Sequence, residues 1–202
     1  MFRIGCWSRS HVCGVAFMAV MLFFAGCGGN PAAPMAAAES APERVVFVSS
    51  TVFTGDFGGA AAADGVCSAL ARAAGLSGAY RAWLSDDQGH SPSTRFSHTQ
   101  LPFVMTSGVR VADHWSDLTD GTINNPIVVD EWGDQPGTVP IVWTGTTASG
   151  QPFGGTLACD GWADGSADAV GQVGEFDAID HGWSASRSVA CDQLGRIYCF
   201  EQ

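Results

Sequence analysis

The chain has 202 residues, with 20 Asp and Glu against 9 Arg and no Lys, and a formal net charge of −11. A surface of this sign excludes nucleic acid as an expected partner, because the phosphate backbone binds basic surfaces. The length fits one domain with its own core. The 26 Gly and 7 Trp predict short strands joined by many turns rather than a helical bundle.

The N-terminal segment is typical of an export signal. Arg3 and Arg9 precede an apolar run from Val12 to Ala25, which is shorter than the ~20 apolar residues of a membrane-spanning helix. Residues 1–26 are therefore predicted to be a removable signal peptide. Without them, seven Arg face 20 acidic residues, which gives a net charge of −13.

The end of this signal resembles a bacterial lipobox, Phe24-Ala25-Gly26-Cys27. In such signals the cysteine becomes the first residue and carries several acyl chains, which anchor a protein stably to a membrane. We expect Cys27 to be the lipidated residue, and Gly28 after it favours the outer membrane or cell surface of a bacterial envelope. The alternative is an ordinary soluble signal peptide with a chance cysteine. Residues 27–44, rich in Ala, Gly and Pro, are predicted to form a flexible tether.

The folded domain is predicted to span residues 45–202. Apolar runs indicate strands, and Gly- and Asp-rich segments separate them. The expected strands are Val45–Val48 with its continuation Thr51–Thr54, Tyr80–Leu84, Leu101–Met105, Val109–Ala112, Ile127–Val129 and Val139–Trp143. Ser91 is expected to cap a short helical turn, Asp160–Asp180 is expected to be an acidic loop, and Trp183–Glu201 is expected to hold two closing strands.

One main helix is predicted at Ala60–Leu76, ended by Gly75. Val66, Leu70 and Ala73 recur at helical spacing and define the predicted buried face, with Cys67 beside them.

Four cysteines remain in the predicted domain: Cys67, Cys159, Cys191 and Cys199. In an exported protein an even set predicts disulfides, and four cysteines allow three pairings between which spacing does not choose. A zinc site is the competing interpretation. It is disfavoured because the sequence lacks two close Cys-x-x-Cys pairs.

Several segments resemble a known family. The motifs are YRAWLSD at residues 80–86, ADHWSDLTDG at 112–121, VWTGT at 142–146 and RIYCF at 196–200. They are similar to those of a bacterial domain-of-unknown-function family that occurs in secreted proteins and lipoproteins and is grouped with the C-type-lectin-like superfamily. The helix with Cys67, the Trp-bearing strand after it and the ending Cys191-x7-Cys199 extend the resemblance over residues 45–202.

The resemblance implies an α+β, C-type-lectin-like fold with short mixed or antiparallel sheets, one main helix and long irregular loops. It also implies two nested disulfides, Cys67 with Cys199 and Cys159 with Cys191. Sugar-binding members hold calcium through Glu-Pro-Asn and Trp-Asn-Asp triplets, whereas this chain has Asn124-Asn125-Pro126 and Trp183-Ser184-Ala185. Calcium-dependent sugar binding is therefore not carried over.

Acidic loops supply the remaining candidate site residues. We interpret these acidic residues as solvated loop carboxylates, because their spacing matches no recognised metal-binding motif. Calcium at Asp117, Asp120 and Asn124 is the alternative, and no other cofactor is expected.

Tryptophans divide into two expected groups. Trp83, Trp115, Trp143 and Trp183 are expected in the core. Trp132 and Trp162, set in acidic polar loops, are candidates for an exposed binding platform together with Asp160, Asp164 and Asp168.

Catalytic motifs are lacking in the sequence: no Gly-x-Ser-x-Gly elbow and no His-Glu-x-x-His helix occur. We therefore expect a non-enzymatic binding or adhesion module, anchored to the envelope through lipid, whose partner is an extracellular or envelope protein or glycan. The loops from about Asp113 to Asp180 are its expected recognition face. The alternatives are a secreted enzyme acting on envelope or extracellular polymer and a structural surface component.

Overall fold

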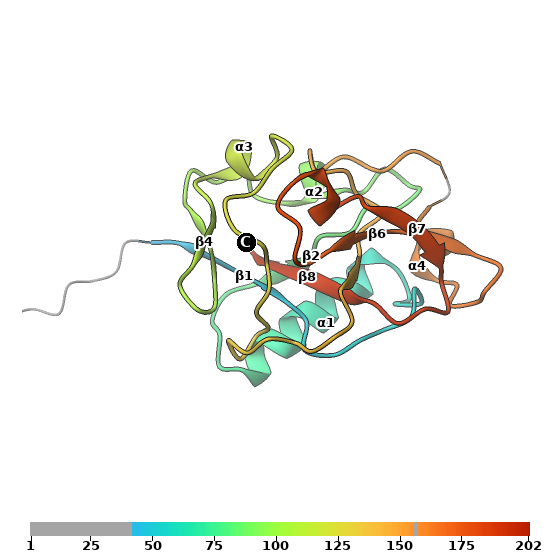
Figure 1. Ribbon diagram of the computed structural model, residues 1–202, viewed down its shortest axis with the longest axis horizontal. Helices are drawn as coiled ribbons and strands as arrows, with labels where there is room; N and C mark the ends of the chain where they lie inside the picture. Colours follow the sequence, from blue (N-terminus) through green and yellow to red (C-terminus); the bar gives the residue numbers. More distant parts are fainter. Residues whose placement is uncertain (1–41, 156) are drawn as a thin grey trace, which may run out of the picture. The chain divides into compact units, whose positions relative to one another are not determined.

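The computed structural model describes residues 42–155 and 157–202. These residues form an α+β fold, in which a mixed sheet of eight strands is accompanied by one long helix and several short helical turns (Figure 1). The predicted signal at 1–26, the predicted lipidation residue Cys27 and residues 28–41 of the predicted tether lie outside the described residues. Within the described ranges, no helix has the length and apolar character needed to cross a membrane.

Most elements are short. The strands are β1 (Arg44–Val48), β2 (Tyr80–Ala82), β3 (Phe103–Met105), β4 (Arg110–Ala112), β5 (Ile141–Trp143), β6 (Val170–Glu175), β7 (Arg187–Ala190) and β8 (Arg196–Glu201). The helices are α1 (Ala60–Ala73), the single turns α2 (Pro92–Arg95), α3 (Trp115–Leu118) and α4 (Cys159–Trp162), and the 3₁₀ turn η1 (His181–Trp183).

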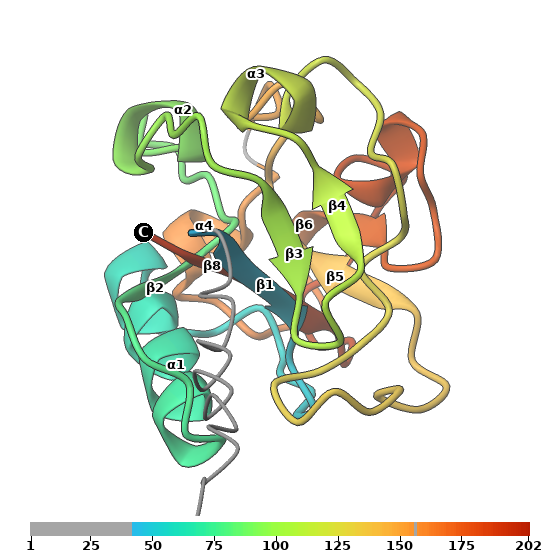
Figure 2. The same cartoon turned by 90° about the vertical axis from the view of Figure 1, so that its left-hand side faces the viewer.

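The last strand is the centre of the sheet. Its order is β4-β3-β1-β8-β5-β6-β7, and β2 pairs with β8 off this path. β1 runs parallel to β3 and β5 parallel to β8, while the other pairs are antiparallel. Figure 2 shows β1, β3 and β4 side by side. Because β8 contacts three strands, the C-terminal segment organises both halves of the sheet.

Side chains of β8 alternate between two separate core clusters. Tyr198 and Phe200 pack in one cluster with Trp83, while Ile197 and Cys199 pack in the other, against α1. The four tryptophans expected in the core are buried: Trp83, Trp115, Trp143 and Trp183. A sheet with apolar clusters on both faces explains why β1 and β8 have apolar runs rather than an apolar–polar alternation.

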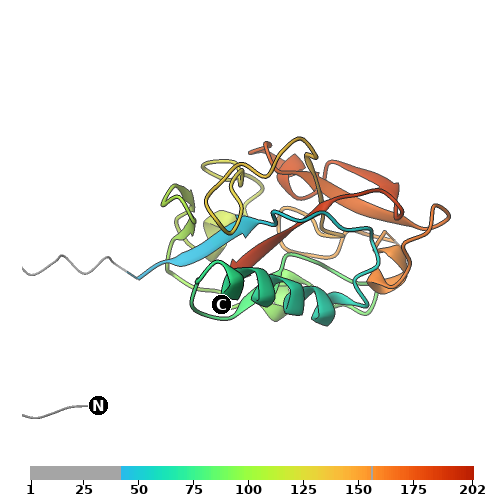
Figure 3. The ribbon, with the colours of Figure 1, turned by 90° about the horizontal axis from the view of Figure 1, so that it is seen from below.

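Helix α1 lies along β8 on one face of the sheet (Figure 3). Its range confirms the predicted helix, with an earlier end at Ala73, and Gly75 follows with φ +76°. The predicted buried face is confirmed in part: Val66 and Leu70 are half-buried against the core, whereas Ala73 is exposed. The buried positions of the helix are Ala60, Ala63, Cys67 and Ala71. Small side chains on this face allow the helix to approach the sheet closely enough for Cys67 to reach β8.

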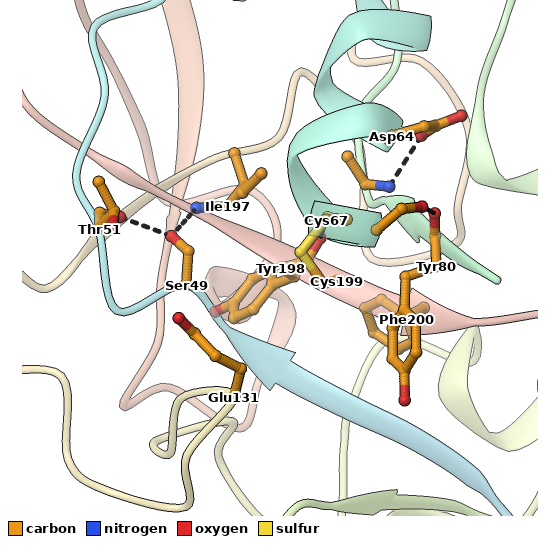
Figure 4. Close-up of a disulfide and its surroundings, with 12 residues drawn as sticks. Ser49, Thr51, Asp64, Cys67, Tyr80, Glu131, Ile197, Tyr198, Cys199 and Phe200 are labelled. Carbon is orange, nitrogen blue, oxygen red and sulfur yellow. Dashed lines mark hydrogen bonds between the residues drawn. A yellow bond between two sulfur atoms is a disulfide. The ribbon is translucent and has the colours of Figure 1, made fainter. Parts of the chain in front are cut away.

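Two disulfides join Cys67 to Cys199 and Cys159 to Cys191, the nested pairing that the resemblance implied. The first connects α1 to the central strand β8 (Figure 4). The second is packed against β6, where a Cβ on Gly171 would lie 2.7 Å from Cys159 Sγ and 2.8 Å from a Trp143 ring carbon. Glycine is required at this position because any side chain would collide with the disulfide and Trp143.

Three segments differ from the predicted pattern. Thr51–Thr54 contributes only an isolated bridge, between Phe53 and Gly195, and Ile127–Val129 forms no strand, although the Val48 N–H donates to the Val129 carbonyl at 3.0 Å. Asp160–Asp180 is not one loop, because it contains α4 and β6. The short turn after Ser91 is confirmed as α2, whose capping box pairs Ser91 with Thr94.

The two tyrosines of the chain, Tyr80 and Tyr198, are both buried, and desolvation raises the pKa of each above its ordinary value. We expect spectrophotometric titration of the folded protein to show no tyrosinate near pH 10, where unfolded tyrosine ionises. Because the folded pKa values are raised, this contribution to stability is complete below about pH 10 and is lost as pH rises toward them. Protein in denaturant is the control, and a native titration step near pH 10 would contradict the burial.

Candidate functional site

The most exposed tryptophan of the described residues lies on a tightly hydrogen-bonded loop, here called the Trp132 loop (Asp130–Asp134). Trp132 is 59% exposed, whereas Asp130 is buried. Asp130 Oδ1 accepts the N–H groups of Trp132 and Asp134 at 2.9 and 3.1 Å. The Asp130 N–H in turn donates to the Asp134 carbonyl at 2.8 Å. These bonds fix the backbone of the loop while its aromatic side chain stays in solvent.

Contacts from two other segments hold this loop in place. The buried carboxylate of Glu131 accepts from the Ser50 N–H at 3.0 Å and from Ser50 Oγ at 2.5 Å. Thr106, in the β3–β4 turn, donates to the Asp130 carbonyl at 2.8 Å. In Figure 2 the yellow-to-gold segment before β5 passes close to that turn. Trp132 is exposed, as the sequence analysis predicted.

Arg196, at the start of β8, hydrogen-bonds to two segments that flank the Trp132 loop, residues 49–50 and 136–139. The side chain is buried, and its guanidinium donates to the carbonyls of Ser49 and Ser50 at 2.7 Å each, to Val139 at 3.2 Å and to Pro136. Burial lowers the pKa of Arg196, and the nearby carboxylates of Asp130 and Glu131 oppose that effect. An ordered loop backbone loses little conformational entropy on binding, which favours recognition.

A second feature is a polar depression of about 400 Å³ beside the N-terminal end of α1, here called the Arg81 depression. Its charged lining comes from α1, β2, α2 and the loop between the last two. The charged or ionisable residues are Asp64, Arg81, Asp86, His90 and Arg95. Among the residues that the structure describes, those lining it include no Ser, Thr or Cys.

Both carboxylates of this depression are occupied by internal bonds. Asp64 Oδ1 accepts from Arg95 Nη2 at 2.5 Å and from the Ala82 N–H at 2.9 Å. Asp86 Oδ2 faces His90 Nδ1 at 2.7 Å, and its Oδ1 accepts the N–H groups of Gln88 and His90. The side chain of Asp86 is 9% exposed. These contacts order the wall of the depression.

Trp162 corrects a sequence prediction, because it is fully buried and forms no exposed platform. Its indole Nε1 donates to the Ser85 carbonyl at 2.8 Å. The carbonyl of Trp162 accepts three N–H groups, from Phe57, Gly58 and Gly59, at 2.9–3.0 Å. These bonds hold the residues that lead into α1, so Trp162 has a structural role that its acidic sequence neighbourhood does not reveal.

The backbone explains why Trp162 points inward. All four residues of α4 have positive φ, and three of them, Cys159, Asp160 and Trp162, are not glycine. Such conformations cost of order 1–3 kcal/mol each and persist only where surrounding contacts fix them. Here the Cys159–Cys191 disulfide and the bonds of Trp162 provide those contacts.

The three aspartates predicted beside Trp162 do not converge with Trp132 into one site. Asp160 and Asp168 are exposed and line a shallow hollow of about 210 Å³. Hydrogen bonds from the Ser166 side chain and backbone lower the pKa of Asp164. This carboxylate therefore accepts hydrogen bonds from its own turn. The expected recognition face from Asp113 to Asp180 is likewise not one surface, since it includes the buried β5 and much of β6.

The residues of the calcium alternative hydrogen-bond within their own loop. Asp117 Oδ2 accepts from the Asp113 N–H at 2.7 Å and from Asn124 Nδ2 at 3.3 Å, while Asp120 Oδ1 accepts the Thr122 N–H. Over residues 42–155 and 157–202, no group of three or more His, Cys, Asp or Glu is arranged to hold a metal. Ser184, next to Trp183, is buried, and its Oγ accepts from Trp83 Nε1 at 2.7 Å.

With this geometry in view, comparison with known proteins adds no assignment. No protein-family model matches the chain, and no curated protein matches it. Function is therefore inferred from the two surfaces themselves.

Sequence reasoning found Trp132 but missed the Arg81 depression and the role of Arg196. The depression takes Asp64 from α1, Arg81 from β2 and Arg95 from α2. Only the tertiary packing of these elements brings the three side chains together. The single local signal is the spacing of Asp86 and His90, four residues apart in a loop. Arg196 resembles any surface arginine in the sequence until its four carbonyl partners are seen.

Proposed function

We propose that this protein is an exported, lipid-anchored binding or adhesion module with a C-type-lectin-like domain, which holds an extracellular or envelope protein or glycan without turning it over. The exposed Trp132 on its fixed loop is the observation that carries the proposal. An indole offers a large contact area with few rotatable bonds, and it packs against both sugar rings and protein side chains.

The surroundings of Trp132 support a binding role. Val109, 43% exposed, lies in the β3–β4 turn, which is bonded to the Trp132 loop through Thr106. Asp134, two residues after Trp132, adds an exposed carboxylate to the same loop. Apolar area with polar groups at its edge is the usual composition of a recognition surface.

The fold assignment draws on the nested disulfides and the mixed sheet. One disulfide joins the main helix to the last strand, and the other joins Cys159 to Cys191 within the preceding segment. The non-catalytic assignment draws on the depression, where the described lining residues around the Asp86–His90 pair include no hydroxyl or thiol side chain. A carboxylate–imidazole pair without a nucleophile fits binding better than covalent catalysis.

Replacing Trp132 by Ala is expected to weaken ligand binding by at least tenfold, since buried interface tryptophans contribute about 2 kcal/mol or more. A glycan array and a pull-down from cell-envelope extracts, each with calcium and with chelator, identify the ligand class. Binding of the wild type and the variant to the captured ligand is then compared.

Leu194→Ala is the matched control, because Leu194 is 52% exposed in the β7–β8 turn, outside the Trp132 loop. It is expected to leave binding unchanged. Equal affinity of Trp132→Ala and wild type would remove the Trp132 loop from the interface, and steady release of cleaved polymer would favour the enzyme alternative.

A further inference from the structure

The exposed indole of Trp132 belongs to an acidic loop. Three of the five residues of the Trp132 loop are acidic, Asp130, Glu131 and Asp134. The Trp132 N–H donates to Asp130 Oδ1 at 2.9 Å, so one carboxylate lies directly beside the backbone of the tryptophan. Asp134 is exposed, and its bonds to Asp130 are made by its backbone. The indole, 59% exposed, is therefore presented to solvent together with negative charge.

The positive charges near this loop are already engaged. Arg196 interacts with the charges of Asp130 and Glu131, but its side chain is buried and donates to four backbone carbonyls. Arg110, on β4, pairs with Asp113 at 2.6 Å. One arginine against three loop carboxylates leaves a formal charge of −2. The loop therefore has negative charge that a partner can neutralise.

Cationic side chains complement this combination of aromatic face and negative charge. The face of a tryptophan ring attracts an ammonium or guanidinium group more strongly than other aromatic side chains do. Val109, 43% exposed in the turn that Thr106 bonds to the loop, offers apolar area for the aliphatic stem of an arginine or lysine. A neutral glycan gains nothing from the charge, and an acidic glycan is repelled by it and by the formal charge of −11 of the whole chain.

We propose that the partner of the Trp132 loop is a basic protein segment, with an arginine or lysine side chain against the Trp132 indole and its charge close to Asp134. This inference rests on the proposed function and narrows its partner from a protein or glycan to one class. Long-range attraction between the acidic domain and a basic segment speeds their encounter, and the indole supplies the short-range contact.

Calorimetric titration of the purified full chain in nonionic detergent, with hexaarginine as the probe, tests the proposal. Hexacitrulline is the control peptide, because citrulline keeps the length and planar head of arginine but has no charge. We expect saturable binding of hexaarginine that weakens as salt is raised, and binding of hexacitrulline that is at least about tenfold weaker. Absence of saturable hexaarginine binding, or equal affinity for the two peptides, would overturn the proposal.

Three variants locate the binding site of the peptide. Trp132→Leu keeps an apolar side chain but removes the aromatic face, and it is expected to weaken hexaarginine binding at least about threefold. Asp134→Asn is expected to weaken it by a similar factor, because one nearby charge is lost. Asp168→Asn is the matched control: it removes the same charge from an exposed residue before β6, on the other side of β8 in the sheet, and is expected to change affinity less than about twofold. Equal losses for Asp134→Asn and Asp168→Asn would mean diffuse attraction to the whole chain and would contradict a basic partner at Trp132.

Competition separates this proposal from the proposed function. Hexaarginine is expected to displace the natural ligand that is captured through Trp132. A captured ligand that needs Trp132 but is not displaced by hexaarginine leaves the binding function standing and rules out the basic partner. Unchanged affinity of the Trp132 variants for both the captured ligand and hexaarginine rules out both proposals.

Discussion

Replacing both Cys67 and Cys199 by Ala is expected to lower the free energy of unfolding by about 4–5 kcal/mol. The disulfide joins residues 132 positions apart, so its loss restores a large amount of conformational freedom to the unfolded chain. It also connects α1 to β8, the strand that pairs with β1, β2 and β5. Folded domains have only about 5–15 kcal/mol of net stability, so the expected loss is a large fraction of the total.

Denaturant unfolding followed by tryptophan fluorescence measures this loss, and the double variant Cys159→Ala/Cys191→Ala provides the comparison. Its bridge spans 32 positions, for which loop closure predicts about 3–4 kcal/mol. Relaxation of the positive-φ residues in α4 acts in the opposite direction, so the measured loss is expected to be smaller. A loss below about 2 kcal/mol for the outer pair would contradict the loop-closure explanation.

The fold was predictable wherever a local pattern coincided with a local structure. The apolar run at β1, the alanine-rich helix ended by Gly75 and the cap of α2 at Ser91 are examples. β6 was not, because Gly171 and Gly174 interrupt its apolar pattern. Both glycines are there for tertiary reasons, since a Cβ at Gly171 would meet Cys159 and Trp143 and a Cβ at Gly174 would meet the Trp183 backbone.

The candidate functional residues were likewise predictable only where a local sequence pattern determined their exposure. Trp132 could be found because a tryptophan among Asp, Glu and Gly has few apolar neighbours in sequence with which to form a core. The same reasoning failed at Trp162, because the turn that directs it inward depends on a disulfide to Cys191, in a distant segment. The Arg81 depression could not be found, since only the packing of α1, β2 and α2 brings its residues together.

Replacing Arg196 by Ala is the second large effect, with an expected loss of about 3 kcal/mol, because hydrogen bonds from a charged donor contribute about 1.5–3 kcal/mol. The change leaves four carbonyl groups without their donor and removes a positive charge that interacts with the buried carboxylates of Asp130 and Glu131. Unpaired buried polar groups carry their full desolvation penalty. The loss should therefore far exceed that from a typical surface arginine.

Arg187→Ala is the matched control, because Arg187 lies on β7, the strand before β8 in the chain, is about half exposed and pairs only with Glu175 among the described acidic residues. Exposed pairs contribute about 1 kcal/mol or less. Arg196→Lys separates charge from geometry: an ammonium keeps the charge near Asp130 and Glu131 but cannot reproduce the planar fork that reaches four carbonyls.

An intermediate stability for Arg196→Lys is expected in the same denaturant assay. Hydrogen exchange should show faster exchange in residues 130–139 of the Arg196→Ala protein, since Arg196 bonds the Pro136 and Val139 carbonyls directly. If Arg196→Ala and Arg187→Ala cost the same, Arg196 does not hold these segments. If exchange in 130–139 increases while the rest of the sheet stays protected, the ordered Trp132 loop depends on this one buried guanidinium, and ligand affinity at Trp132 should fall with it.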